Sequence, residues 1–371
     1  MAGFPFMRQA EAFRSSLPFI LLLAVFILPC PMSAAAKPRP AIAFVHLLLP
    51  PGGEPHASPA GWIGSLDRAR DTLESLRIPT IVSSASPGNA EDLNELSEMD
   101  PEVLITTSPL LYAAACDVAK RSPNTVFFAC TDETVHDNMS GFQARTYEAH
   151  YLAGLIAGAL SEDGVIGYLA NDPYQSKASR LRNANAFTLG AQKSKAAIRV
   201  LYAPGNDPDE ELKTLIAAGA DIVDLERALP SLVERLREHS VRYVGTAGRT
   251  VDPLCLAAPE WEWSNAFGDL LTQVRFGIWR PRNVSYGIKE GVVGLSPFGP
   301  AVPETVRVRV REAKEAIRNG ASPFEGPVRD VSGSLRIAEG SVPDDATLRG
   351  MDWRVQGLEP LPLTPDGLQG L

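Results

Sequence analysis

Short apolar runs alternate with helical patterns along most of this chain, and this alternation constrains the fold more than any other feature. The first run, AIAFVHLL at 41–48, is continuously apolar, as expected of a strand buried on both faces. A helical pattern at 62–76 follows it, and the same order recurs as far as VRYVGTAG at 241–248. Strands that alternate with helices form parallel sheets covered on both faces. We therefore predict an α/β fold with doubly wound parallel sheets.

The alternation is interrupted once, at 131–146, where TDETVHDNMSGFQART has no clear period. An interruption between two α/β halves indicates two lobes joined by a hinge. Because open parallel sheets bind ligands at the carboxyl ends of their strands, two such sheets predict a binding cleft between the lobes. We expect a first lobe at 37–147, to which about 249–282 return, and a second lobe at 148–248, to which about 283–371 belong.

The first residues have the pattern of a secretory signal peptide. Arg8 and Arg14 precede a 12-residue apolar block, LPFILLLAVFIL, and Ala34-Ala35-Ala36 supply small residues before Lys37. The block is short for an uncleaved membrane anchor, which needs about 20 residues. We therefore predict that residues 1–36 are removed on export to the periplasm or another exported location.

A lipid anchor at Cys30 is the alternative to soluble export. Lipidation requires a cysteine directly after small residues, but Leu28 and Pro29 precede Cys30. Proline is a poor residue beside a cleavage point, so soluble export is favoured over lipid anchoring.

The charge of the remaining chain limits its partners. Loss of Arg8, Glu11 and Arg14 changes the formal net charge from −9 to about −10. An acidic surface argues against binding to nucleic acid or to anionic membranes. The remaining length suggests two domains. Three cysteines would remain, an odd number that does not fit a disulfide scaffold, and a bridge between Cys116 and Cys130 is left open.

The segment YEAHYLAGLIAGAL at 147–160 contains a G-x-x-x-G spacing, Gly154 and Gly158, that also occurs in membrane helices. Its uncharged apolar run is ten residues long, too short to span a bilayer. We expect a helix whose glycines let it lie close to its sheet. Glu148 at the start of this helix either complements the helix dipole or faces the cleft and accepts a ligand N–H.

The usual motifs of enzymes and metal sites are absent from the sequence. We find no H-E-x-x-H or C-x-x-C spacing, no G-x-S-x-G, no phosphate-binding G-x-x-x-x-G-K-[ST] and no G-x-G-x-x-G after a strand. We therefore expect no enzymatic activity, no cofactor and no metal.

Tryptophans lie where two predicted elements begin. Trp62 follows the loop LPPGGEPHASPAG, and Trp261 and Trp263 lie in APEWEW before a helix. An indole at the carboxyl end of a strand can stack on a flat ligand, for about 1–3 kcal/mol per stacked base. Packing of each indole against the core at a helix end is the alternative.

The segment YEAHYLAGLIAG followed by GVIGYLA resembles the crossover helix and strand of the basic membrane protein family, the solute-binding proteins of ABC importers. Further similar segments are NANAFTLGAQ at 183–192, GVVGLSPFGPAVP at 291–303 and SPFEGPVRDVSGSLRIAEG…MDWRVQGL at 322–358. The resemblance implies the two-lobed fold of type I periplasmic binding proteins. It also implies a purine base or nucleoside as ligand, a membrane permease as partner and a monomeric protein.

The resemblance also implies the residues of the site. Trp62 and Trp263 would stack on the base, and Ser108 and Glu148 would form hydrogen bonds with it. The other positions that match family residues are Arg182, Asn185 and Lys289.

Several polar positions differ from the family pattern. The loop after the first strand lacks an aspartate, Ala228 and Ala247 replace acidic residues, and Glu262 stands in place of Asn or Asp. Loss of hydrogen-bonding groups changes what a buried site can hold. The alternative function is therefore a sensor or accessory protein that binds a different small molecule in the same cleft.

Overall fold

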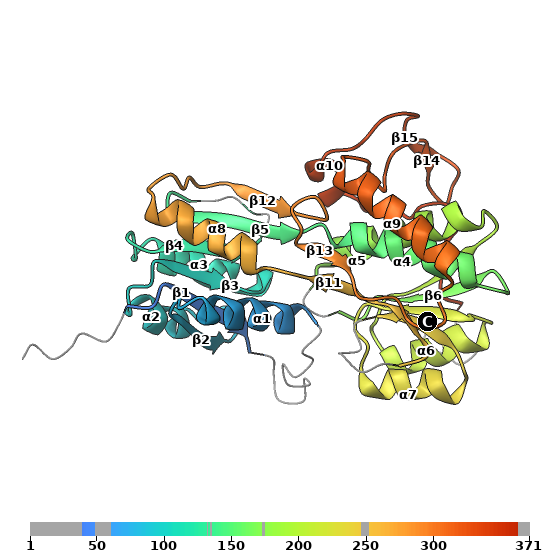
Figure 1. Cartoon of the computed structure of the whole chain (residues 1–371), viewed down its shortest axis with the longest axis horizontal. Coiled ribbons are helices and arrows are strands. Elements are labelled where there is room, and N and C mark those ends of the chain that lie inside the picture. Colours follow the sequence, from blue (N-terminus) through green and yellow to red (C-terminus); the bar gives the residue numbers. More distant parts are fainter. Residues whose placement is uncertain are drawn as a thin grey trace, which may run out of the picture. The chain divides into compact units, whose positions relative to one another are not determined.

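The computed structural model describes residues 39–48, 61–131, 133, 136–172, 175–245 and 252–362 (Figure 1). The predicted signal peptide at 1–36, with Cys30, lies outside the described residues, as does Ala247. Among the described helices, none combines the length and the apolarity that a bilayer-spanning segment requires.

The first sheet has six strands in the order β12-β5-β4-β3-β1-β2, and every pair is parallel. The strands are β1 (Ile42–Leu47), β2 (Thr80–Ala85), β3 (Val103–Thr106), β4 (Val126–Cys130), β5 (Met139–Ala144) and β12 (Asn283–Tyr286). Alternate residues of β1 enter different cores: Ile42 and Phe44 pack with α1 (Trp62–Ser75) and α8 (Ser264–Arg275). Ala43 and Val45 pack with α2 (Glu91–Ser97) and α3 (Tyr112–Ala119) on the other face.

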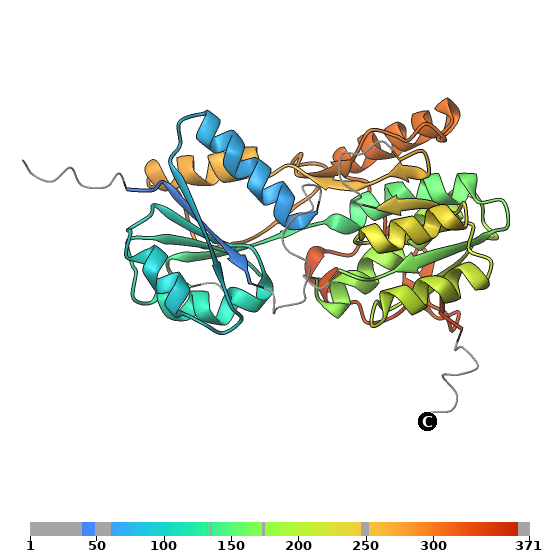
Figure 2. The ribbon, with the colours of Figure 1, turned by 90° about the horizontal axis from the view of Figure 1, so that it is seen from below.

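The second sheet repeats this design in the order β10-β9-β8-β6-β7-β16, again with all pairs parallel. Its strands are β6 (Val165–Leu169), β7 (Arg199–Ala203), β8 (Ile222–Leu225), β9 (Arg242–Gly245), β10 (Cys255–Ala257) and β16 (Leu358–Pro360). Helices α4 (Thr146–Leu160) and α5 (Lys177–Ser194) cover one face, and α6 (Pro208–Ala217) and α7 (Pro230–Glu238) cover the other (Figure 2). The predicted doubly wound parallel fold is confirmed.

Smaller elements join the sheets and complete the second lobe. Strand β11 (Pro259–Trp261) pairs antiparallel with β13 (Val293–Leu295) between the two sheets, and α9 (Glu304–Arg318) packs on α4. The remaining elements are the short helix Pro109–Leu111, β14 (Val328–Arg329), β15 (Leu335–Ile337) and α10 (Asp345–Arg349).

The points at which the chain passes between the sheets differ in part from those expected. Strand β10 at 255–257 belongs to the second sheet, and β12 at 283–286 belongs to the first. The segment of the returning chain that joins the first lobe therefore extends from α8 to the end of β12. The interrupted stretch at 131–146 contains β5, whose sequence MSGFQA lacks the β-branched residues that most of the other strands contain.

Helices α4 and α5 pack at unusually close range because glycines lie at their contact. A Cβ atom on Gly154 would lie 2.0 Å from the Phe187 carbonyl oxygen, and one on Gly158 would lie 2.2 Å from that of Ala191. From the other helix, a Cβ on Gly190 would lie 2.1 Å from the Tyr151 carbonyl oxygen. The three cysteines of the described residues, Cys116, Cys130 and Cys255, form no disulfide bond.

Candidate ligand-binding site

Polar and aromatic residues gather at the carboxyl edges of the two sheets. In the first lobe, Thr107 and Ser108 follow β3 and Thr131 follows β4, and all three are buried. In the second lobe, Asn171 follows β6 and Glu226 follows β8. These edges are where open parallel sheets bind ligands. Residues 49–60 and 246–251, which follow β1 and β9 in the chain, lie outside the described residues.

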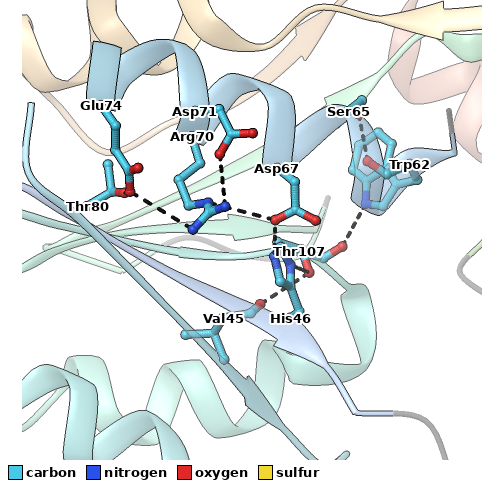
Figure 3. Close-up of polar contacts among 10 residues, drawn as sticks. All are labelled: Val45, His46, Trp62, Ser65, Asp67, Arg70, Asp71, Glu74, Thr80 and Thr107. Carbon is cyan, nitrogen blue, oxygen red and sulfur yellow. Dashed lines mark hydrogen bonds and ion pairs between the residues drawn. The ribbon is translucent and has the colours of Figure 1, made fainter. Parts of the chain in front are cut away.

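Trp62 is half-buried at the first position of α1, beside the carboxyl edge of the first sheet. Its indole N–H donates to the Thr107 carbonyl oxygen at 2.8 Å, which fixes the plane of the ring (Figure 3). The rings of Trp261 and Trp263 meet it edge-on, at centroid distances of 5.8 and 5.2 Å. Phe142 lies nearly parallel to it at 6.5 Å. The ring is therefore held by aromatic neighbours and by one backbone acceptor.

A chain of polar contacts supports the segment that holds Trp62. His46 on β1 lies 3.2 Å from the Thr107 hydroxyl through Nδ1 and 3.2 Å from Asp67 of α1 through Nε2 (Figure 3). The Thr107 hydroxyl donates to the Val45 carbonyl oxygen. These contacts join β1, β3 and α1 at one point, so the carbonyl that orients Trp62 is itself fixed.

Trp263 occupies a different environment from Trp62. It is 0% exposed, and its ring is stacked on Phe267 at 5.5 Å with Phe142 and Tyr286 at its edges. Its indole N–H has no hydrogen-bond partner among the residues that the structure describes. The structure places Trp263 in the core behind Trp62, where its ring faces are covered by protein.

Glu148 has both carboxylate oxygens engaged within the protein. Oε1 accepts from Nε of Arg145 at 2.7 Å, and Oε2 accepts from the Ile288 backbone N–H at 2.6 Å. Burial raises the pKa of Glu148, against the lowering effect of Arg145 and of the Ile288 N–H. Arg145 also donates to the Ser285 carbonyl oxygen and to Glu290. Glu148 thus joins the start of α4 to the turn after β12.

Replacing Glu148 with glutamine is expected to lower the free energy of unfolding by about 1–2 kcal/mol, because the ionic bond to Arg145 is lost. Ligand affinity should change by less than about threefold. Urea unfolding and calorimetric titration of the same preparation measure the two quantities. Glu304→Gln, which removes an exposed ion pair with Arg311 on α9, is the matched control and should cost little. A large loss of affinity with unchanged stability would contradict this assignment.

The remaining predicted residues lie in three settings. Ser108 is buried, and its hydroxyl oxygen accepts from the Leu110 N–H, so its own O–H can still donate. Asn185 binds the C-terminal segment by donating to the Trp353 carbonyl oxygen at 2.8 Å and accepting from the Val355 N–H at 2.9 Å. Lys289 is exposed in the turn between β12 and β13.

Arg182 lines a small pocket. Its guanidinium lies 5.7 Å from the ring centre of Tyr147 and donates to the Leu348 carbonyl oxygen. The pocket has further basic and acidic residues in its wall. Its lining comprises Gln143, Ala144, Arg145, Tyr147, Arg182, Ser285, Asp345, Leu348 and Arg349.

Of the positions that depart from the family pattern, the two that the structure describes, Ala228 and Glu262, take no part in these contacts. Ala228 is half-buried in the apolar core beside α6 and α7. Glu262 is exposed, and its Oε1 accepts from the backbone N–H and the hydroxyl of Ser264 at the start of α8. Ala228 therefore has a packing role, and Glu262 stabilises the start of α8.

Sequence reasoning missed a buried acidic group in the second lobe. Glu226 directly follows β8, two residues before Ala228. Asp224 on the same strand lies 3.3 Å from His150 of α4, and Tyr168 of β6 donates to Glu226 at 2.8 Å. The available signal was two acidic residues at alternate positions of an otherwise apolar strand end, IVDLE. Among the described residues, no group of three or more His, Cys, Asp or Glu side chains could hold a metal ion.

Comparison with known proteins shows which proteins this chain is similar to. Residues 66–217 match the Bmp family model, described as "ABC transporter substrate-binding protein PnrA-like". A purine-binding protein of Brucella abortus is 28% identical over 344 residues, which cover 88% of this chain and 95% of that protein. A putative ABC transporter glucose-binding protein of Haloferax volcanii is 28% identical over 307 residues, covering 76% and 78%.

Solved structures agree on the fold. An ABC transporter solute-binding protein of Conexibacter woesei superimposes with a TM-score of 0.60 at 17% identity, covering 76% of this chain and 97% of that one. A solute-binding protein of Aeropyrum pernix gives a TM-score of 0.59 at 16% identity, covering 83% and 95%. The fold and the family model define a substrate-binding protein of ABC transporters, a class that is not enzymatic. Within this class, the match to the basic membrane protein family spans residues 66–217, less than half of the chain, and the chain is similar to that family.

Proposed function

We propose that this protein is exported and captures a purine base or nucleoside for an ABC importer. The observation that carries the proposal is the half-buried indole of Trp62 at the carboxyl edge of the first sheet, held in one orientation by Thr107. Because its N–H is occupied, the indole can offer a ligand only its ring. A flat aromatic heterocycle is the ligand that such a surface favours. The relative from Brucella abortus, named a purine-binding protein, supports the same class.

The other proposed ligand contacts are with Ser108, Arg182 and Lys289. Ser108 keeps a hydroxyl proton to donate, Arg182 lines a pocket, and Lys289 is exposed. In this proposal Trp263 supports Trp62 from behind, and Glu148 and Asn185 position the segments around the site; their contacts within the protein support these roles.

A panel of ligands tests the proposal. Adenine, hypoxanthine, adenosine, guanosine and glucose are each added to the mature protein, and the thermal unfolding midpoint is measured. A ligand that binds only the folded protein stabilises it by about 2.7 kcal/mol at a hundredfold excess over Kd. Stabilisation by at least one purine is expected, and absence of any purine effect would overturn the proposal.

Replacing Trp62 with alanine is expected to weaken purine binding by about 1–3 kcal/mol, because the stacking surface is removed. Trp62→Phe should retain much of the affinity. Trp279→Ala is the matched control, since this half-buried tryptophan precedes β12 at the opposite edge of the first sheet. Titration calorimetry measures the three affinities, and equal affinities in Trp62→Ala and the wild type would remove the stacking role.

A sugar or another small molecule is the second candidate ligand, because the Haloferax volcanii relative is named a putative glucose-binding protein. Such a protein could act in transport or as a sensor or accessory protein. Stabilisation by glucose without stabilisation by purines would favour this function. Export is tested separately, by recovery of a protein beginning at Lys37 from the periplasmic or secreted fraction of the source cells.

A further inference from the structure

Glu226 has a buried carboxylate of which only one oxygen accepts hydrogen bonds from the residues that the structure describes. Its side chain follows the central strand β8 and is 7% exposed. Oε1 accepts from the Tyr168 hydroxyl at 2.8 Å and from Nδ2 of Asn183 at 3.4 Å. Oε2 is buried and has no hydrogen-bond partner among the residues that the structure describes. A buried acceptor without a donor is costly, more so when it is charged.

The position of Glu226 is fixed by its neighbours. Asn171, after β6, donates to the Arg227 carbonyl oxygen at 2.8 Å and accepts from the Arg227 N–H at 2.9 Å. These two bonds hold the turn that carries Glu226. Asn183 also donates to Gln175 at 2.8 Å, so its amide is oriented. The residues that bind Oε1 therefore belong to a rigid arrangement, and Glu226 itself directly follows β8 at the carboxyl edge of the sheet.

The neighbouring residues on β8 and β6 donate no hydrogen bond to Oε2 of Glu226. Asp224, which is 0% exposed, directs Oδ2 toward His150 at 3.3 Å. Tyr168 lies opposite Asp224 on the neighbouring strand β6. Burial raises the pKa of Glu226 to about 7, and the nearby His150 opposes this rise. The carboxylate form at slightly alkaline pH is a hydrogen-bond acceptor only.

We infer that Glu226 is the recognition residue of the second lobe and that its Oε2 accepts a hydrogen bond from the exocyclic amino group of an aminopurine. This inference rests on the proposed function. A donor on the ligand supplies the partner that Oε2 lacks among the described residues, and an oxo group at the same place would meet an acceptor. Glu226 therefore selects amino-substituted over oxo-substituted purines.

Glu226→Gln tests this selection because it reverses the polarity at one atom. Tyr168 and Asn183 both donate to Oε1, so the glutamine amide oxygen must take that position. Its NH2 group then replaces Oε2 and turns an acceptor into a donor. The variant keeps the shape of the side chain and both internal hydrogen bonds.

Affinities for adenine and hypoxanthine are measured by titration calorimetry at pH 8. The wild type should prefer adenine by about tenfold or more, and Glu226→Gln should abolish or reverse this preference. Glu226→Asp, which withdraws the oxygens by one methylene, should weaken adenine binding while keeping its preference. Glu238→Gln, exposed at the end of α7, is the matched control and should leave both affinities unchanged.

The outcomes separate this inference from the proposed function. Binding of purines with the same adenine-to-hypoxanthine ratio in the wild type and Glu226→Gln overturns the inference alone. Absence of purine binding by the wild type overturns the proposed function and the inference with it. If Glu226→Gln does not fold, the Glu226→Asp affinities decide, and unchanged adenine binding in that variant overturns the inference.

Discussion

Replacing Gly154 with alanine is expected to lower the free energy of unfolding by about 3 kcal/mol, although alanine is the better helix former. The added Cβ would lie 2.0 Å from the Phe187 carbonyl oxygen, which belongs to the backbone of α5. No side-chain rotation can relieve this overlap, so α4 and α5 must separate along their contact. Separation would open gaps among the buried residues of both helices, and interiors lose stability when such gaps form.

The matched control is Gly268→Ala in α8, where a Cβ would have no atom within 4 Å. There the intrinsic helix preference of alanine should raise stability by about 1 kcal/mol. Urea unfolding measures the change in the free energy of unfolding for both variants, and the two changes should have opposite signs. If Gly154→Ala were as stable as the wild type, the close packing of α4 on α5 would be wrong.

This helix contact illustrates what sequence patterns can and cannot provide. The glycines of the segment at 147–160 predict close packing, but a one-dimensional pattern does not name the partner. The prediction of helix on sheet was incomplete, because the tightest contact of α4 is with the backbone of α5. The parallel sheets were predictable because β1, buried on both faces, is continuously apolar and is followed by a helix. Strand β5 escaped detection because MSGFQA is neither continuously apolar nor alternating.

The candidate site was predictable only where position along the chain determines the environment. Trp62 begins a helix after a strand and a loop, and this order alone places it near the carboxyl edge of a parallel sheet. The complete burial of Trp263 depends on Phe142, Phe267 and Tyr286, which come from three other elements. The unsatisfied oxygen of Glu226 likewise depends on which atoms Tyr168 and Asn183 reach. Such properties arise from tertiary contacts and leave no local pattern.

Between pH 5 and pH 8 the free energy of unfolding is expected to fall by on the order of 2–3 kcal/mol because of Glu226. Burial raises the pKa of Glu226 to about 7 from its ordinary value of 4.5, with His150 opposing the rise. Between these two values the folded protein binds a proton that the unfolded chain does not. The stabilisation is therefore complete below about pH 4.5 and is lost as the pH rises through about 7.

The groups that face Glu226 affect the size of this change but not its direction. They are His150 from α4, Asp224 from β8, and Tyr168 and Asp172 from β6 and the residues after it. Burial lowers the pKa of His150, but the stronger combined effect of its acidic neighbours, Asp224 first, raises it. A raised histidine pKa also gives stability that is lost as pH rises, so the two groups act in the same direction.

Glu226→Gln is expected to remove most of the decline, because a glutamine does not titrate. Urea unfolding at one-unit intervals from pH 5 to pH 8 gives the profile for the wild type, for Glu226→Gln and for the exposed control Glu238→Gln. The control should follow the wild type throughout. If Glu226→Gln instead ran parallel to the wild type, Glu226 would not titrate in this range. If Glu226→Gln does remove the decline, the ionised Glu226 of the unliganded protein lowers the free energy of unfolding above pH 7. A ligand that donates a hydrogen bond to Oε2 should then stabilise the protein more at pH 8 than at pH 5.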